Sequence, residues 1–199
     1  MGFTSSTPSP LLTQKSASFV DLGWLTQRVR ACLRSDAAEV DVEALHLWLS
    51  RAGWRGYSYL RTYVYDGQYE VDHANYRAHR QVLDAIAEIP GVDLRLGHVI
   101  ERNGIRQQKG VDALIVLDML TLAYQGAYQA AVLVAGDRDF AQVVRAVQGR
   151  GIFVAQSGPE SRDGVSKELR QVADGFLAMP EAGIRQLLLR NTPEGGAAR

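Results

Sequence analysis

Apolar residues along the chain follow two patterns, short buried runs and stripes at helical spacing. Residues 130–135 are small or branched apolar residues that lead into Gly136 and Asp137, as in a buried strand that ends in a tight acidic turn. The next apolar residues recur at the i, i+3, i+4 and i+7 positions of one helix face: Phe140, Val143, Val144 and Val147. Asp137 and Asp139 therefore lie where a strand gives way to a helix, the edge at which open α/β sheets bind ligands.

The same unit of strand, acidic turn and helix recurs along the chain. An apolar run over residues 17–20 ends in Asp21, and a glycine-containing turn then leads into a helix through about residue 33. The run at 57–65 has the aromatic and β-branched content of a strand and is closed by Asp66 and Gly67. The remaining pattern predicts helices at 42–51, 75–89, 111–124, 138–148, 166–178 and 184–190, strands at 92–100 and 152–156, and a polar loop at 101–110.

Strands that alternate with helices pair in parallel and form a sheet covered on both faces. We therefore predict a three-layer α/β/α sandwich with a mostly parallel central sheet of about five strands, over residues 17–190. Residues 1–16, which are rich in Ser, Thr and Pro, and residues 191–199 are expected to be flexible tails. Parallel order brings the strand-ending acids Asp21, Asp66 and Asp137 to one edge of the sheet.

Composition excludes several classes of protein. With 22 basic and 22 acidic residues, the chain has no bulk positive charge, so any nucleic-acid binding depends on a local basic patch. Cys32 is the only cysteine, which excludes an intramolecular disulfide and a cysteine-based zinc site and is compatible with the cytoplasm. No signal peptide or membrane span is expected. The sequence leaves open whether the chain forms a homo-oligomer.

Several carboxylates at one sheet edge repel one another, so such a cluster usually persists because a cation neutralises it. Mg²⁺ suits this role, since it takes one or two carboxylates, keeps several waters and completes its shell with phosphate oxygens. That chemistry is typical of phosphodiester hydrolysis. For either aspartate alone, a simpler interpretation stays open: Asp137 as a helix N-cap and Asp139 as an acid that complements the helix dipole.

Four separated motifs, in this order, together resemble the NYN domain and specifically its LabA-like (DUF88) branch. They are Phe-Val-Asp-Leu-Gly-Trp-Leu at 19–25, Gln-Lys-Gly-Val-Asp at 108–112 with Asp118 after it, Gly-Asp-Arg-Asp-Phe at 136–140, and a closing pattern of Ser166, Leu169, Ala173, Asp174 and Phe176. The resemblance spans residues 17–178. It implies a PIN-like nuclease fold and a ribonuclease, dependent on Mg²⁺ or Mn²⁺, that acts on RNA, which we expect to be single-stranded.

The resemblance also implies the residues of the site. Asp21, Asp112 and Asp137 match the acids that hold the metal, and Asp139 matches a following catalytic acid. The chain departs from the family at two places: Trp24 and Leu25 occupy a region where some members carry an asparagine, and Ala135 stands where a serine is frequent.

Other polar and aromatic residues allow two interpretations each. Arg102, Arg106 and Lys109 precede Asp112 and can bring an RNA backbone to the acids, or they form a solvated loop. Four tyrosines at odd spacing share one face of the strand at 57–65 and are expected in the core rather than stacked on bases: Tyr57, Tyr59, Tyr63 and Tyr65. Asp66, with Glu70 and Asp72, is interpreted as a solvated turn. Asp118 lies about 120° around the helix from Asp112 and is expected to be structural.

Two other classes of protein compete with the nuclease. A non-catalytic NYN-fold regulatory or RNA-binding protein stays open, because fold does not fix function. A haloacid-dehalogenase-like phosphatase needs a second aspartate two residues after the first, and Asp21-Leu22-Gly23 lacks it. The nuclease prediction requires that Asp21, Asp112 and Asp137 converge within reach of one hydrated ion.

Overall fold

The computed structural model of the chain describes residues 14–52, 56–102 and 105–187, without the side chains of residues 101–107. Most of the two predicted tails lies outside the described residues. The first strand begins at Gln14, three residues before the apolar run at 17–20 from which the sequence predicts it. The last described residue is Leu187, so the predicted helix at 184–190 is described only in its first part.

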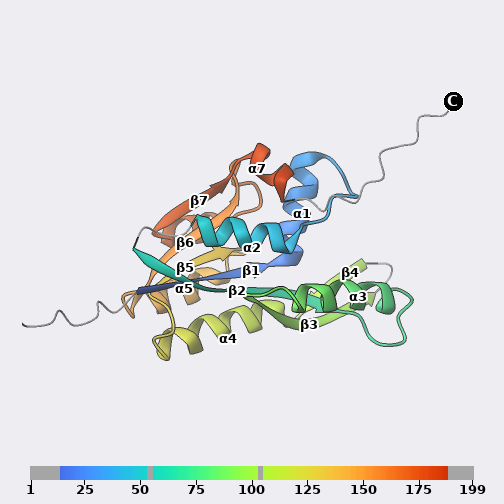
Figure 1. Ribbon diagram of the computed structural model, residues 1–199, viewed down its shortest axis with the longest axis horizontal. Helices are drawn as coiled ribbons and strands as arrows, with labels where there is room; N and C mark the ends of the chain where they lie inside the picture. Colours follow the sequence, from blue (N-terminus) through green and yellow to red (C-terminus); the bar gives the residue numbers. More distant parts are fainter. Residues whose placement is uncertain (1–13, 53–55, 103–104, 188–199) are drawn as a thin grey trace, which may run out of the picture.

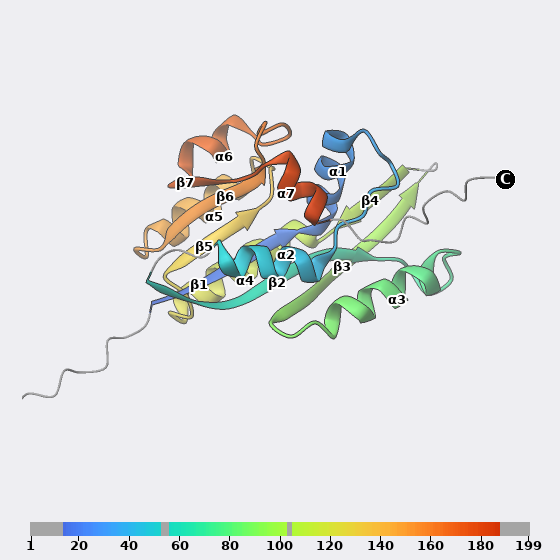
Figure 2. The same ribbon diagram turned by 45° about the horizontal axis from the view of Figure 1, so that its top comes forward.

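One central sheet runs through the described part of the chain, with seven strands in the order β4-β3-β2-β1-β5-β6-β7 (Figure 2). All neighbours pair in parallel except β3 and β4, which are antiparallel. The strands are β1 (Gln14–Asp21), β2 (Tyr57–Gln68), β3 (Val92–Arg102), β4 (Ile105–Lys109), β5 (Ala130–Val134), β6 (Phe153–Pro159) and β7 (Gly175–Met179).

Helices cover both faces of this sheet, which confirms the predicted α/β/α sandwich (Figure 1). One face packs against α4 (Val111–Tyr124), α5 (Phe140–Gln148) and α6 (Lys167–Val172). The other packs against α1 (Leu22–Leu33), α2 (Val42–Arg51), α3 (Tyr76–Ala87) and α7 (Glu181–Gln186).

The alternation of side chains along the central strands builds the two cores. Phe19 on β1 and Leu133 on β5 enter the core with α4 and α5, while their neighbours Val20 and Val134 enter the core with α1 and α2. All four are fully buried, and each side chain of this size stabilises the fold by roughly 1.5–3 kcal/mol. Strands buried on both faces explain why the sequence runs at 17–20 and 130–135 are continuously apolar.

The sheet has seven strands and not about five, because the sequence pattern of one edge strand predicts a loop and that of the other predicts the end of a helix. Residues 105–109, expected in a polar loop, form β4, which pairs with β3 through backbone groups from His98↔Lys109 to Arg102↔Ile105. The predicted helix at 166–178 is α6 only as far as Val172, because Ala173 is extended (ψ 138°) and leads into β7. Residues 175–179 are mostly apolar but directly follow α6, so hydrophobic pattern alone does not separate β7 from that helix.

The prediction that four tyrosines share one face was also wrong. In β2, Tyr59 pairs with Ser16 and Arg61 with Ala17, so Leu60 is an extra residue that forms a bulge. The bulge reverses the alternation: Tyr63 and Tyr65 enter the core with α4, whereas Tyr59 packs on the opposite core. Burial of Tyr63 and Tyr65 confirms that they are core residues and not a surface for stacking bases.

Candidate acidic site and adjoining cleft

Asp21 stands at the centre of the sheet edge, as the last residue of β1 and the N-cap of α1. Its carboxylate accepts a hydrogen bond of 2.9 Å from the backbone N–H of Trp24, and only 9% of the residue is exposed. Burial, together with the nearby carboxylates of Asp112, Asp66 and Asp137, raises the pKa of Asp21 to about 6, against the lowering effect of the Trp24 hydrogen bond. An acid in this position is poorly compensated by the protein alone.

Asp112 lies in the first turn of α4, which begins after Gly110. The turn into this helix requires a left-handed backbone at Gly110 (φ 81°), a conformation that glycine adopts without strain. Partial burial and the neighbouring Asp137 and Asp139 raise the pKa of the Asp112 carboxyl. Asp112 is therefore electrostatically coupled to both Asp21 and the turn after β5.

Asp137 and Asp139 are exposed residues in the turn between β5 and α5. Asp139 occupies the N-cap position of α5 but makes no side-chain capping bond, and Asp137 Oδ1 accepts only a long contact of 3.4 Å from the Asp139 N–H. Asp139 also pairs with the neighbouring Arg138 at 3.6 Å. The N-cap interpretation of Asp137 therefore finds little support, whereas Asp139 at the start of α5 is placed to complement the helix dipole.

The four expected acids lie in one electrostatic neighbourhood, without a preformed cage. In the described part of the chain, no three or more His, Cys, Asp or Glu side chains are arranged to hold a metal ion directly. The carboxylates of Asp112 and Asp137 nevertheless both raise the pKa of Asp21. This donor set, hard carboxylate oxygens with space between them, fits an ion that keeps several of its waters, as Mg²⁺ does.

Trp24 forms the wall between Asp21 and the β5–α5 turn. Its indole N–H donates to the Gly164 carbonyl (3.2 Å), and the ring lies so close to Gly136 that a Cβ there would approach Trp24 Nε1 to 2.3 Å and the Gly164 oxygen to 2.2 Å. Gly136 is thus required by close packing just before Asp137. Leu25, by contrast, is a fully buried core residue.

Asp66 was wrongly interpreted as part of a solvated turn. It is 8% exposed, because β2 continues past Asp66 and pairs with β3 as far as Gln68↔His98. One carboxylate oxygen, Oδ1, accepts from the Gly67 N–H (2.7 Å) and from the side-chain amide of Gln108, and Oδ2 lies 3.6 Å from His79 Nε2. The signal was present in the sequence, since Asp66 also ends a strand-like run.

Gln108 on β4 lies over the backbone that follows Asp21. A Cβ on Gly23 would approach Gln108 Oε1 to 2.5 Å, and one on Gly67 would approach Gln108 Cγ to 3.0 Å. Two glycines therefore make room for this side chain. Sequence reasoning missed Gln108 as a site residue, because its place depends on the unpredicted strand β4.

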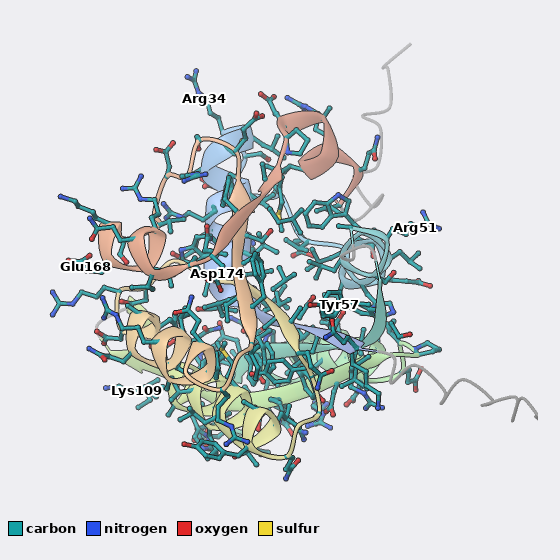
Figure 3. The ribbon with its side chains drawn as sticks, turned by 90° about the vertical axis from the view of Figure 1, so that its left-hand side faces the viewer. Arg34, Arg51, Tyr57, Lys109, Glu168 and Asp174 are labelled. Atoms are coloured by element: carbon teal, nitrogen blue, oxygen red, sulfur yellow. The ribbon has the colours of Figure 1, made fainter. Side chains whose placement is uncertain are left out.

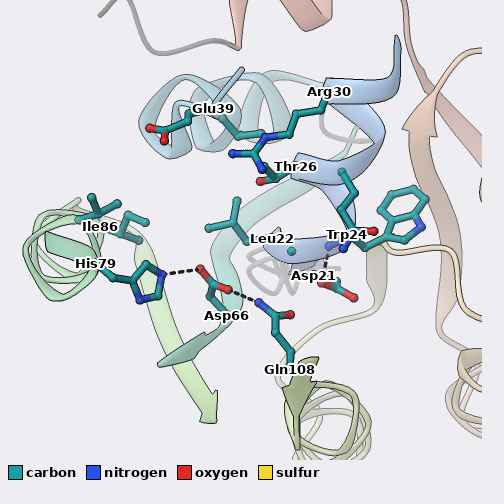
Figure 4. Close-up of a pocket in the computed structure, with 14 residues that line it drawn as sticks. Asp21, Leu22, Trp24, Thr26, Arg30, Glu39, Asp66, His79, Ile86 and Gln108 are labelled. Carbon is teal, nitrogen blue, oxygen red and sulfur yellow. Dashed lines mark hydrogen bonds and ion pairs between the residues drawn. The ribbon is translucent and has the colours of Figure 1, made fainter. Parts of the chain in front are cut away.

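A cleft of about 460 Å³ opens from Asp21 between α1 and α3 (Figure 4). Strand ends and helices both contribute polar groups to its lining, and the helices α1 and α3 also contribute apolar side chains. The residues that line it include Asp21, Leu22, Asp66, His79, Ile86 and Gln108. Asp112, Asp137 and Asp139 do not line this cleft, so Asp21 joins the acidic neighbourhood to it.

The expected basic residues are only partly described. Lys109 ends β4 and is exposed at the surface of the molecule (Figure 3). Arg102 and Arg106 lie at the β3–β4 turn, and their side chains lie outside the described residues. Asp118 accepts a hydrogen bond from the buried Tyr65 hydroxyl (2.9 Å) and pairs with Arg95 (3.3 Å), which fits the structural role expected of it.

Comparison with known proteins identifies the family. Residues 24–180 match the NYN domain. The chain belongs to the NYN domain family. The match includes Asp112, Asp137 and Asp139 and begins just after Asp21. The NYN family includes PIN-like nucleases, which generally use divalent metals and act on nucleic acid.

Individual relatives add the fold but no activity. An uncharacterized protein of Sinorhizobium fredii, y4oD, is 44% identical over 91 residues, which is 45% of this chain and 41% of that protein. A crystal structure of a Vibrio parahaemolyticus protein of unknown function, VPA0982, has a TM-score of 0.63 at 21% identity and covers 91% of this NYN chain and 99% of its own. This likeness shows the fold alone. None of the helices in the described residues has the length and apolar character needed to cross a membrane.

Proposed function

We propose that this NYN domain is a metal-dependent ribonuclease that hydrolyses RNA phosphodiester bonds. The observation that carries the proposal is the buried Asp21 carboxyl, whose pKa is raised to about 6 by burial and by three neighbouring carboxylates. Such a cluster opposes folding unless a cation neutralises it, and activity often resides in groups of this kind. The order of the four sequence motifs supports the LabA-like branch of the family.

The acids take distinct roles in this proposal. Asp21, Asp112 and Asp137 hold Mg²⁺ or Mn²⁺, directly or through water, and Asp139 orients a water at the rim of the site. A bound divalent cation neutralises charge on the phosphate and acidifies a coordinated water. The buried position of Asp21 fixes its carboxylate, because the Trp24 N–H holds one oxygen.

Substrate binding is assigned to the basic residues before α4. Lys109 is exposed three residues before Asp112, and Arg102 and Arg106 precede it at the β3–β4 turn. Arg and Lys supply most contacts to a phosphate backbone, so these residues would bring a single RNA strand to the acids. A chain with zero net charge and a single cysteine is compatible with action in the cytoplasm.

The test is cleavage of end-labelled single-stranded RNA by the purified full chain in Mg²⁺, in Mn²⁺ and in EDTA. Asp21→Asn and Asp137→Asn should each lower the rate by roughly 100-fold or more, since even partners of metal ligands cost 10–100-fold. Asp84→Asn, on the exposed face of α3, is the matched control and should cleave as the parent does. Metal-independent cleavage, or cleavage that survives Asp21→Asn, contradicts the proposal.

A protein that binds RNA but cuts none under any of these conditions is instead the non-catalytic regulatory or RNA-binding member of the family. Binding of labelled RNA should therefore be measured on the same preparations. In that case the aspartate substitutions would leave RNA unbroken in every sample and change only affinity.

A further inference from the structure

The side-chain amide of Gln108 has a fixed orientation. An ionised carboxylate only accepts hydrogen bonds, so the amide must turn its NH₂ group toward Asp66. Gly67 N–H donates to the same carboxylate oxygen, and His79 stands at the other, which holds Asp66 in place. The amide oxygen Oε1 of Gln108 is therefore directed away from Asp66.

This oxygen has no donor among the described residues. It lies against Gly23, two residues after Asp21, and Figure 4 shows it on the side of the amide that faces Asp21. Two acceptors, the Asp21 carboxylate and Gln108 Oε1, thus stand at the mouth of the cleft. A ligand that satisfies Oε1 must bring a hydroxyl or N–H group.

The depth of the cleft adds a second requirement. Leu22, Val40 and Ile86 give it apolar walls, whereas Thr26, Arg30 and Glu39 add polar groups, and its volume of about 460 Å³ is within the range of small-molecule sites. A planar base suits this lining, because its faces can pack on the apolar side chains while its edge meets the polar ones. If the phosphate lies at Asp21, the group of a nucleotide nearest Gln108 is the sugar, and the base lies deeper.

We propose that this cleft binds one nucleoside of the RNA next to the acids, and that Gln108 accepts a hydrogen bond from its ribose 2′-hydroxyl. Gln108 is then the residue that distinguishes RNA from DNA, since the 2′-hydroxyl is the group that separates them. Asp66 acts as the positioning residue that keeps the amide oxygen turned to the sugar. This inference rests on the proposed function, because it takes RNA to be the ligand.

The probes are adenosine and 2′-deoxyadenosine, which are uncharged and need no metal, titrated in EDTA while the amide and indole NMR signals of the cleft are followed. The parent should bind adenosine roughly 3- to 10-fold more tightly than 2′-deoxyadenosine, the range that one hydrogen bond supports. Gln108→Met keeps the length but removes the acceptor, so it should bind the two nucleosides equally. Gln142→Met, at an exposed glutamine of α5, is the control and should keep the preference.

A pair of substitutions at Asp66 tests positioning separately from folding. Asp66→Asn can still present an oxygen to the Gln108 amide and should keep the ribose preference. Asp66→Ala frees the amide and should abolish the preference although Gln108 is intact. Affinity for 2′-deoxyadenosine is the internal check, because a collapsed cleft would lose both nucleosides together.

The two proposals fail in different ways. Ribose preference that depends on Gln108, in a protein that cuts no RNA, supports the cleft and refutes the nuclease. RNA cleavage by a protein whose cleft binds neither nucleoside up to their solubility limit overturns the cleft inference alone. The inference is equally overturned if Gln108→Met keeps the ribose preference.

Discussion

Replacement of Asp21 by asparagine should stabilise the metal-free protein while it abolishes the proposed activity. The asparagine side chain cannot ionise, yet its carbonyl oxygen can still accept the hydrogen bond from the Trp24 N–H that the carboxylate accepts at 2.9 Å. The substitution therefore removes a buried charge and keeps the cap of α1. Active sites often contain functional groups that lower the stability of the fold.

The size of the effect follows from the pKa of Asp21. Folding raises this pKa from 3.8 to about 6, and one pKa unit corresponds to about 1.4 kcal/mol, so the ionised group opposes folding by about 3 kcal/mol. At 9% exposure there is little solvent screening to reduce this figure. Asparagine gives up a charge-assisted hydrogen bond, so we expect a net gain of about 1–3 kcal/mol in the free energy of unfolding.

The stability gained by Asp21→Asn should depend on pH. Above about pH 7, Asp21 is ionised in both the folded and the unfolded chain, so the full penalty is present. As the pH falls through about 6, the folded chain takes up the proton while the unfolded chain stays ionised, and the penalty shrinks. Below about pH 4 both states are largely protonated, and Asp21→Asn should have almost no advantage.

Thermal unfolding in EDTA at pH 8, 6 and 4 is the assay, with guanidinium titrations at the same pH values. A gain of about 2 kcal/mol corresponds to a rise of about 4–8 °C in Tm for a chain of this size. Asp84→Asn, which breaks only an exposed pair with Arg80, should change stability by less than about 1 kcal/mol at every pH. Equal stability of Asp21→Asn and parent at pH 8, or the same gain at pH 4, would refute the account of Asp21 as an uncompensated buried acid.

Two further substitutions test the packing around the site. Gly136→Ala should destabilise the fold by about 1–3 kcal/mol or more in thermal unfolding, because its methyl group meets the Trp24 indole. The control Gly183→Ala in α7 meets only ordinary contacts and should be neutral or stabilising. Equal effects of the two substitutions would contradict the close approach of Trp24 to Gly136. Tyr65→Phe should lower the free energy of unfolding by about 1–2 kcal/mol, because the hydrogen bond to Asp118 is lost, and should leave RNA cleavage unchanged. A large loss of cleavage with full stability would instead place Asp118 in the site.

The interior of the fold was predictable from the sequence, and its edges were not. The strands β1 and β5 are buried on both faces and leave a continuous apolar signature. The edge strands are harder to predict, because β4 is mostly polar in sequence and the short apolar run of β7 directly follows a helix. The bulge at Leu60 was beyond prediction as well, because it is a property of pairing with β1 and not of the β2 sequence.

The candidate site divides in the same way. Asp21, Asp112 and Asp137 are predicted from motifs that a strand and a helix present in a fixed order. Asp66 and Gln108 were missed because their positions depend on contacts between segments 42 residues apart. Such a pair has no local spacing, and only the β2–β3–β4 pairing brings its members together.

The sheet order also gives the acids different surroundings, which the sequence motifs do not distinguish. β1 lies between β2 and β5, so the end of β1 has the end of β2 on one side and the turn after β5 on the other. Asp21 is therefore the residue affected by Asp66 and Asp137 together, whereas Asp112 is affected by Asp137 and Asp139. Asp21 is also the acid that lines the cleft. A central strand thus makes one carboxylate common to the acidic neighbourhood and to the proposed nucleoside site, and a substitution at Asp21 should affect both.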